Sequence, residues 1–252
     1  MKKLVITICI ATIGLLAGCT TSNEQTINII KTISSTNIQQ IKIDAKSTNI
    51  ELSPSKQTEI QAELKGQVTN RVVNLNIQSS QEIVTIVENE KYEGSDTKAE
   101  LTLHIKIPEK LYQKLAIKNE AGNIKLQKNL QVNNLEIHSK YGDITVNSLK
   151  SLPKNPTNVS INNDRGQVTL DLTEPIIGNH NIQISSGNLY LQVGQKPTPI
   201  DVDFQVQAGN IHPDFPLKGS ASNSMNGHIG TKNESKNQLK AKVLSGNIHL
   251  KK

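Results

Sequence analysis

The chain of 252 residues contains no tryptophan and few other aromatic residues, four tyrosines and two phenylalanines. Hydrophobic residues make up 35% of the sequence, less than a Rossmann or TIM-barrel enzyme usually needs for its core. These shortages argue against an ordinary globular enzyme. Isoleucine, leucine and valine nevertheless recur at alternating positions throughout, which argues against a disordered chain.

The N-terminus has the pattern of a secretory signal. Two lysines follow Met1, and residues 4–16 form an apolar run that is too short to span a bilayer of about 30 Å as a helix. The run ends in Leu16-Ala17-Gly18-Cys19. This order of one aliphatic residue, two small residues and a cysteine resembles the lipobox of bacterial lipoproteins. The alternative is an ordinary secretory signal with an incidental cysteine.

The lipobox resemblance implies that residues 1–18 are a signal peptide and that Cys19 carries the acyl chains, palmitate among them. Two or three acyl chains anchor a protein stably to a membrane. The other cysteine, Cys9, lies in the discarded segment, so no thiol remains for a disulfide. The sequence thus predicts a lipoprotein of the bacterial cell envelope, in the outer membrane if the cell is Gram-negative, with a periplasmic or surface-exposed domain.

Residues 19–36 are rich in Ser, Thr and Asn and predict a tether, although residues 27–29 could form a first short strand. Residues 37–252 repeat one short phrase, Gly-Asn-Ile-x-Leu. Between corner glycines from Gly122 to Gly246, the steps are 20, 24, 21, 22, 18 and 19 residues. An early copy has Thr48 in place of glycine. The other copies lie at 122–126, 142–146, 166–170, 187–191, 209–213, 227–230 and 246–250, with 227–230 degenerate.

A second strand precedes each corner, and one of its aliphatic residues always lies an odd number of positions before the corner residue. The aliphatic residue lies five positions before the corner in the early copies, as at Ile117, and three before it in the later ones, as at Ile184. Five and three differ by two, so the same face of the strand points inward. Glycine permits a positive φ, and Asn or Asp tolerates left-handed geometry, so Gly-Asn suits a corner.

Two folds fit this pattern. Alternating strands around Gly-Asn also predict hairpins, and hence an antiparallel β-sandwich. The nearly constant step favours a single-domain, all-β solenoid, right-handed and parallel β-helix-like, in which equivalent positions stack about 4.8 Å apart. Residues 56–107 differ: they predict four longer strands at 60–64, 72–77, 83–87 and 101–107, with a charged loop at 88–98. These strands form either longer rungs or a covering sheet.

The repeats resemble the putative-adhesin β-solenoid domain of bacterial envelope proteins, a domain of unknown function. Members repeat Ser-Gly-Asp/Asn-Ile-x-Val/Leu, as residues 186–191 and 245–250 do here, and lead into the repeats through a strand and a proline, here 101–108. The resemblance covers residues 37–252 and implies the solenoid architecture. It does not imply a particular function, and the chain departs from the pattern at Pro213 and over 219–230.

The residue after each corner glycine is polar, and in a stack these residues would form a column that invites comparison with a binding site. We interpret this polar column of the corners instead as a ladder of side chains bonded along the stack. His212 and His249 share one repeat position and should point outward. No ligand cluster accompanies them, so we expect no metal and no cofactor. The corner column comprises Asn123, Asp143, Gln167, Asn188, Asn210 and Asn247.

Asp201 and Asp203 share one strand face, and paired carboxylates could serve a solenoid enzyme that acts on a polysaccharide. A solvated face is the simpler interpretation. The formal charge of +6 is spread over lysines, with only Arg71 and Arg165 as arginines, so nucleic-acid binding is not expected. The leading hypothesis is a lipid-anchored, non-enzymatic envelope protein whose solenoid binds an envelope glycan or a protein; the alternative is the carbohydrate-active enzyme.

Overall fold

A computed structural model describes residues 24–93, 97–149, 155–173, 177–194, 199–214, 220–230 and 237–251. These residues form twenty strands and no helix. Accordingly, no helix in this part of the chain is long and apolar enough to cross a membrane. The signal peptide expected over 1–18 and the lipidation site Cys19 lie outside the described residues and stay predictions.

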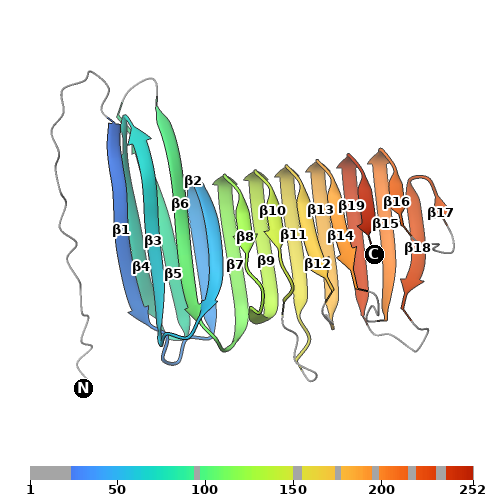
Figure 1. Cartoon of the computed structure of the whole chain (residues 1–252), viewed down its shortest axis with the longest axis horizontal. Coiled ribbons are helices and arrows are strands. Elements are labelled where there is room, and N and C mark those ends of the chain that lie inside the picture. The colour runs from blue at the N-terminus through green and yellow to red at the C-terminus, as the bar shows by residue number, and fades with distance from the viewer. Residues whose placement is uncertain are drawn as a thin grey trace.

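The strands build two facing sheets that run the length of the molecule (Figure 1). In spatial order, sheet A contains β1 (Glu24–Ser34), β3 (Glu59–Thr69), β6 (Lys98–Pro108), the second half of β2 (Gln40–Ser55), β8 (Ile124–Leu126), β10 (Ile144–Val146), β12 (Val168–Leu172), β14 (Leu189–Val193), β20 (Ile248–Lys251) and β16 (Ile211–Pro213). Sheet B contains β4 (Arg71–Ser80), β5 (Ile83–Tyr92), the first half of β2, β7 (Leu111–Ala121), β9 (Gln131–Tyr141), β11 (Asn158–Arg165), β13 (Asn179–Ser186), β19 (Gln238–Ser245), β15 (Ile200–Ala208), β18 (Ser224–Ile229) and β17 (Ser220–Ala221).

The repeats form a β-solenoid, and the sandwich alternative is wrong. Each Gly-Asn phrase carries the chain from a sheet B strand to a sheet A strand, and equivalent strands of neighbouring rungs pair in parallel. The register aligns equivalent repeat positions: Ile144 pairs with Ile124, and Ile137 with Ile117. Parallel pairing in register needs one rung per repeat, which explains the nearly constant step.

The corners require glycine because neighbouring rungs approach very closely there. Gly187 has a φ of 145°, and a Cβ added to it would lie 1.9 Å from the carbonyl oxygen of Gly166. Gly246 stands in the same relation to Gly187, again at 1.9 Å. Any side chain would collide with the backbone of the next rung. At Thr48, where the glycine is missing, β2 instead runs through the corner as one continuous strand.

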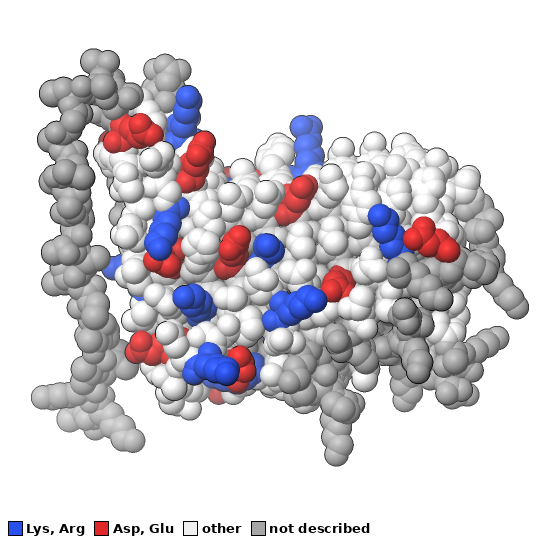
Figure 2. Space-filling view, in the orientation of Figure 1, with Lys and Arg blue, Asp and Glu red and all other residues white. Residues whose placement is uncertain are grey.

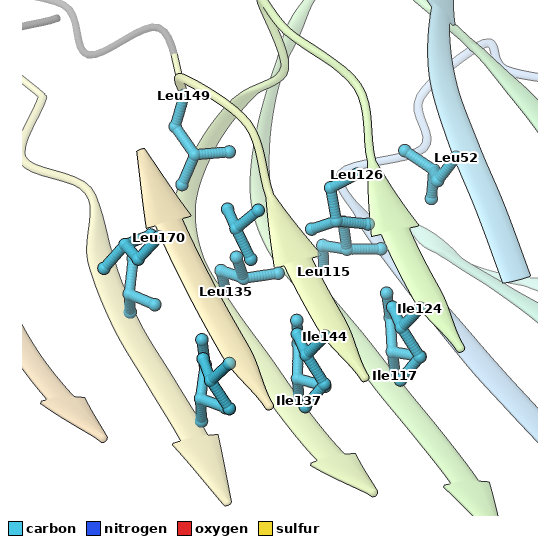
Figure 3. Close-up of a cluster of buried hydrophobic side chains, with 14 of the residues drawn as sticks. Leu52, Leu115, Ile117, Ile124, Leu126, Leu135, Ile137, Ile144, Leu149 and Leu170 are labelled. Carbon is cyan, nitrogen blue, oxygen red and sulfur yellow. The ribbon is translucent and has the colours of Figure 1, made fainter. Parts of the chain in front are cut away.

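The core is a column of aliphatic side chains between the two sheets. The inward positions predicted from parity are buried, from Ile43 in β2 to Val243 in β19, at 2% and 0% exposure. Figure 3 shows how leucines and isoleucines of successive rungs stack, for example Leu115 with Leu135 and Ile124 with Ile144. Because a single rung cannot cover its apolar residues without the rungs on either side, stability depends on the stack.

Two rungs lie out of chain order. Strand β2 lies between the β5–β6 rung and the β7–β8 rung, although β3 to β6 follow it in sequence. At the other end, β19–β20 lies between β13–β14 and β15–β16, although it comes last in the chain. Only the rungs between these two insertions stack in the order of the sequence.

Antiparallel strand pairs lie at both ends of the solenoid. Three expectations from the sequence are corrected there. Residues 24–34, expected within the tether, form β1, which contains the short strand considered at 27–29 and is longer than it, because alternating isoleucines such as Ile29 pack on the core and pair with β3. The degenerate copy at 227–230 is no corner, since it belongs to β18, which pairs antiparallel with β15. The charged loop expected at 88–98 is shorter: β5 extends to Tyr92 and turns Glu88 inward.

The long strands of 59–108 resolve the choice left open by the sequence. Strands β5 and β6 form a rung of the solenoid against β2. Strands β3 and β4 instead extend the two sheets outward in antiparallel pairing with β6 and β5. The expectation of longer rungs is therefore confirmed for β5 and β6, whereas β3 and β4 continue sheets A and B at the N-terminal end and form no separate covering sheet among the described strands.

Candidate functional site

The polar column of the corners is a ladder of hydrogen bonds along the stack, as predicted. In five of the six steps along the stack, the main-chain N–H of one corner residue donates to the side-chain oxygen of the neighbouring corner; the exception is the step from Gln167 to Asn188. This use of the side-chain oxygens gives the column a structural role. The donor–acceptor pairs are Asn123 to Asn49, Asp143 to Asn123 and Gln167 to Asp143, each at 2.8 Å, and Asn247 to Asn188 and Asn210 to Asn247, each at 2.9 Å.

A column of three rings stands on the outer face of sheet A. His212 and His249 point outward as expected and stack, with ring centroids 5.0 Å apart. Tyr190 extends the stack on the other side of His249, at 4.9 Å and an interplanar angle of 8°. Partial burial, together with the neighbouring His212, lowers the pKa of His249 and favours its neutral form.

The two aspartates proposed for an enzyme lie on β15 and face outward. The Oδ1 of Asp201 lies 2.8 Å from the Nδ1 of His228 on the neighbouring strand β18. Asp203 lies in register with Asn226 of β18 and Lys240 of β19. Asp201 therefore helps to hold together β15 and β18, the antiparallel end hairpin of sheet B, which is a structural role.

A cluster of charged and polar groups is buried at the N-terminal end. Arg71 Nη1 lies 2.7 Å from Glu90 Oε2, and the Arg71 guanidinium also stacks on the ring of Tyr92. Glu88 is 1% exposed, and its Oε2 accepts a hydrogen bond of 2.7 Å from the main-chain N–H of Lys46. Burial raises the pKa of Glu88, because its charged form is poorly solvated there.

His180 is a further buried titratable group. It occupies an inward position of β13 that is Val159 in one neighbouring rung and Leu239 in the other. It is 2% exposed, and neither ring nitrogen has a hydrogen-bond partner. Burial lowers the pKa of His180 to about 4, so the ring is neutral at pH 7.

The remaining sequence candidates are dispersed. His104 lies beside Glu51, Nδ1 to Oε2 at 3.3 Å, and Arg165 stacks over the ring of Tyr141 at 5.7 Å. His138 is exposed on sheet B. Within the described residues, no group of three or more His, Cys, Asp or Glu side chains could hold a metal ion.

Two open grooves lie on the outer faces of the sheets. One, of about 460 Å³, crosses β1, β3 and β6 of sheet A beside Gly66. The other, of about 500 Å³, crosses β5, β2, β7, β9 and β11 of sheet B, with the half-buried Ala116 at its centre. On the face seen in Figure 2, lysines and acidic residues interleave over the N-terminal half, and fewer charged side chains of the described residues are visible on the other half.

Sequence reasoning missed several of these residues, although the repeat contains the signal for two of them. Tyr190 aligns with His249 in the same repeat position, so aligning the copies would have predicted the ring column. His180 falls on the inward parity of its strand, which would have predicted its burial. The pairing of Arg71 with Glu90 has no such signal, because it depends on the hairpin of β4 and β5.

Comparison with known proteins identifies one family. The Toastrack DUF4097 family matches residues 38–174, more than half of the chain. No curated protein matches the sequence.

Several solved structures match the chain at low sequence identity. A "putative cell adhesion protein" from Clostridium sporogenes is 11% identical with a TM-score of 0.54, over 90% of this chain and 99% of that chain. A "putative adhesin" from Bacteroides fragilis is 10% identical with a TM-score of 0.33, over 89% and 97%. Another, from Parabacteroides distasonis, is 12% identical with a TM-score of 0.40, also over 89% and 97%. Of these three, only the first is similar enough to support the fold.

Proposed function

The chain belongs to the Toastrack DUF4097 family, a family of unknown function, and on that premise we propose a lipid-anchored binding protein of the bacterial cell envelope. In this proposal Cys19 holds the acyl anchor, and the solenoid offers its outer faces to an envelope glycan or a protein. It performs no chemical reaction. The "putative cell adhesion protein" of similar fold from Clostridium sporogenes agrees with this role.

One observation carries the proposal: the outward side chains form continuous rows, mostly of polar residues, across consecutive rungs. In sheet B the row through Lys42, Ala116 and Glu136 crosses neighbouring strands in register. In sheet A the row through Lys125 and Thr145 does the same. A regular, exposed and extended surface of this kind suits contact with a long or repetitive partner, which a small pocket does not.

The alternative of a carbohydrate-active enzyme receives no comparable support. Its two carboxylates lie on the outer strand β15, where Asp201 contacts His228 of the end hairpin. A catalytic acid and base need convergent positions around a substrate. The contact with His228 instead joins Asp201 to a neighbouring strand, so we do not propose this activity.

The anchor is tested by metabolic labelling with a palmitate analogue. The wild-type chain should incorporate label and remain in the membrane fraction after a high-salt wash. Cys19→Ser should lose both properties, whereas Cys9→Ser should keep both because Cys9 lies in the segment removed. Equal labelling of wild type and Cys19→Ser would contradict the anchor.

The binding role is tested with the purified solenoid and fractionated cell envelopes. We expect the solenoid to sediment with the envelope polysaccharide or protein fraction at low salt and partly release as salt rises, because exposed lysines contribute. Protease treatment of intact cells then separates surface from internal locations. If the solenoid sediments with no envelope fraction at low salt, the proposed function fails.

A further inference from the structure

The groove on sheet B has features that specify a class of ligand. It runs along the solenoid axis, across five strands from β5 to β11, and has a volume of about 500 Å³. Its floor includes Ile43, Ile117 and Ile137, whose side chains point into the core at 2% exposure each. These residues therefore present mainly backbone to the groove. The two walls are rows of outward side chains on either side of this floor.

One wall is the row Thr85, Lys42, Ala116, Glu136 and Ser160, in register from β5 to β11. Ala116 is the smallest member and lies in the middle, between a lysine and a glutamate. Its short side chain keeps the centre of the groove open. Glu136 Oε2 also lies 2.7 Å from Lys114 Nζ, which is outside the groove and holds the carboxylate in place.

The other wall is the row Val87, Asp44, Lys118, His138 and Asn162, also in register. Lys118 Nζ and Asp44 Oδ2 lie 3.8 Å apart, beyond the length of a close ion pair. Both groups keep donors or acceptors for a ligand. His138 and Asn162 are exposed and add an imidazole and an amide.

The charges in the groove balance. Lys42 and Lys118 offset Asp44 and Glu136, so the groove has no net formal charge apart from His138. A nucleic acid or an acidic polymer would meet two carboxylates and gain little. An uncharged chain rich in hydroxyl groups would instead receive charge-assisted hydrogen bonds from both walls.

The spacing of the walls also favours a chain molecule. The side chains within each wall recur at the strand spacing of about 4.8 Å, and the five strands span about 19 Å. An extended polysaccharide advances by a similar distance per sugar, so each rung can meet one sugar unit. A compact ligand would use only part of this length.

We propose that the groove of sheet B binds an extended, neutral polysaccharide, with about one sugar per rung. The proposal rests on the binding role argued above and names its ligand class and its site. Because the ligand is uncharged, binding here should change little with salt, unlike general attraction to exposed lysines.

The test uses the complete solenoid and two probes, the hexamers of β-1,4-linked glucose and of β-1,4-linked N-acetylglucosamine, by titration calorimetry at physiological salt. At least one hexamer should bind. Ala116→Trp fills the centre of the groove from outside the core and should weaken this binding by at least about tenfold. The matched control is Gln192→Trp, at a half-buried outward position of β14 in sheet A that belongs to neither proposed row, and it should leave the affinity unchanged.

A second variant guards against misfolding of Ala116→Trp. Asp44→Asn keeps the shape of the side chain, removes one charged acceptor and should weaken hexamer binding severalfold, while the circular dichroism spectrum stays unchanged. If neither hexamer binds, or if Ala116→Trp binds as wild type does, the groove is not the site. Should the solenoid still sediment with envelopes at low salt in that case, the proposed function survives and only this inference fails.

Discussion

At the scale of single residues, His180 and Glu88 are both buried, and acid affects the two in opposite directions. His180 avoids its charged form by staying unprotonated, since burial lowers its pKa. Glu88 keeps its proton to a higher pH in the folded chain than in the unfolded one, since burial raises its pKa. The dependence of stability on pH therefore contains two contributions of opposite sign that single substitutions can separate.

For His180, the pKa falls from 6.5 in the unfolded chain to about 4 in the folded one. Between these values the unfolded chain binds more protons, so the free energy of unfolding decreases as pH falls, by about 3 kcal/mol in all. His180→Leu should abolish this decrease. It should also raise the free energy of unfolding at pH 7 by about 1 kcal/mol or more, because no unpartnered ring nitrogen stays buried.

Urea unfolding at about pH 7 and about pH 5 measures both effects. His138→Gln, at an exposed position, serves as the control and should behave as wild type. If His180→Leu loses as much stability between the two pH values as wild type does, the burial of a neutral His180 is not the cause.

For Glu88, the folded pKa lies above the ordinary value of 4.5, so the folded chain binds the proton more tightly. Its contribution is favourable below pH 4.5 and is lost as pH rises through the folded pKa. Glu88→Gln removes the charge but keeps an oxygen for the Lys46 N–H. The variant should melt at a higher temperature than wild type near pH 7, and the difference should shrink toward pH 4.5. An equal gain from Glu82→Gln, which is exposed, would contradict this account.

At the scale of the repeat element, the corner combines a steric requirement with a hydrogen bond, and the steric part should dominate. Gly187→Ala places a Cβ 1.9 Å from the Gly166 oxygen at a φ of 145° and should cost at least about 2 kcal/mol. Asn188→Ala removes the acceptor for the Asn247 main-chain N–H, together with longer hydrogen bonds to the Asn247 amide and the Tyr190 hydroxyl, and should cost about 1 kcal/mol. Ser185→Ala, exposed beside the corner, should change little. Chemical denaturation of the three variants would contradict this ranking if Asn188→Ala were the most damaging.

The same element explains how much could be predicted from sequence. The parity of Ile117 and Ile184 relative to their corners predicts which faces are buried, because a strand alternates strictly between its two faces. The repeat does not predict that β18 pairs antiparallel, since the copy at 227–230 keeps the glycines but not the strand that should precede them. The groove of sheet B likewise depends on five strands in register, including β2, whose place among later strands no local pattern encodes.

At the scale of the whole molecule, the out-of-order rung β19–β20 should determine which strands at the C-terminal end unfold locally together. Among the described strands, β15 pairs only with β18 and β19, so its ladder to the rest of the solenoid runs through β19. Val243 of β19 and Val206 of β15 are paired and buried, at 0% and 3% exposure. Val243→Ala should speed amide exchange in β19, β20, β15 and β16 together, whereas Val206→Ala should affect β15 to β18 and spare β13 and β14.

Hydrogen exchange followed by mass spectrometry measures this difference by segment. Both substitutions remove the same atoms from the same row of the core, so each is the control for the other. Unchanged protection of β15 and β16 with Val243→Ala would show that the C-terminal end does not depend on β19.

The two displaced rungs also have an evolutionary consequence. Between them, from β7 to β14, the next rung in space is the next rung in the chain. Duplication of one repeat there adds a rung and leaves the strand order at both ends unchanged. Each copy lengthens the molecule by about 4.8 Å. Natural variation in the length of such solenoids should therefore arise in the middle of the gene, while the out-of-order strands at both ends are kept.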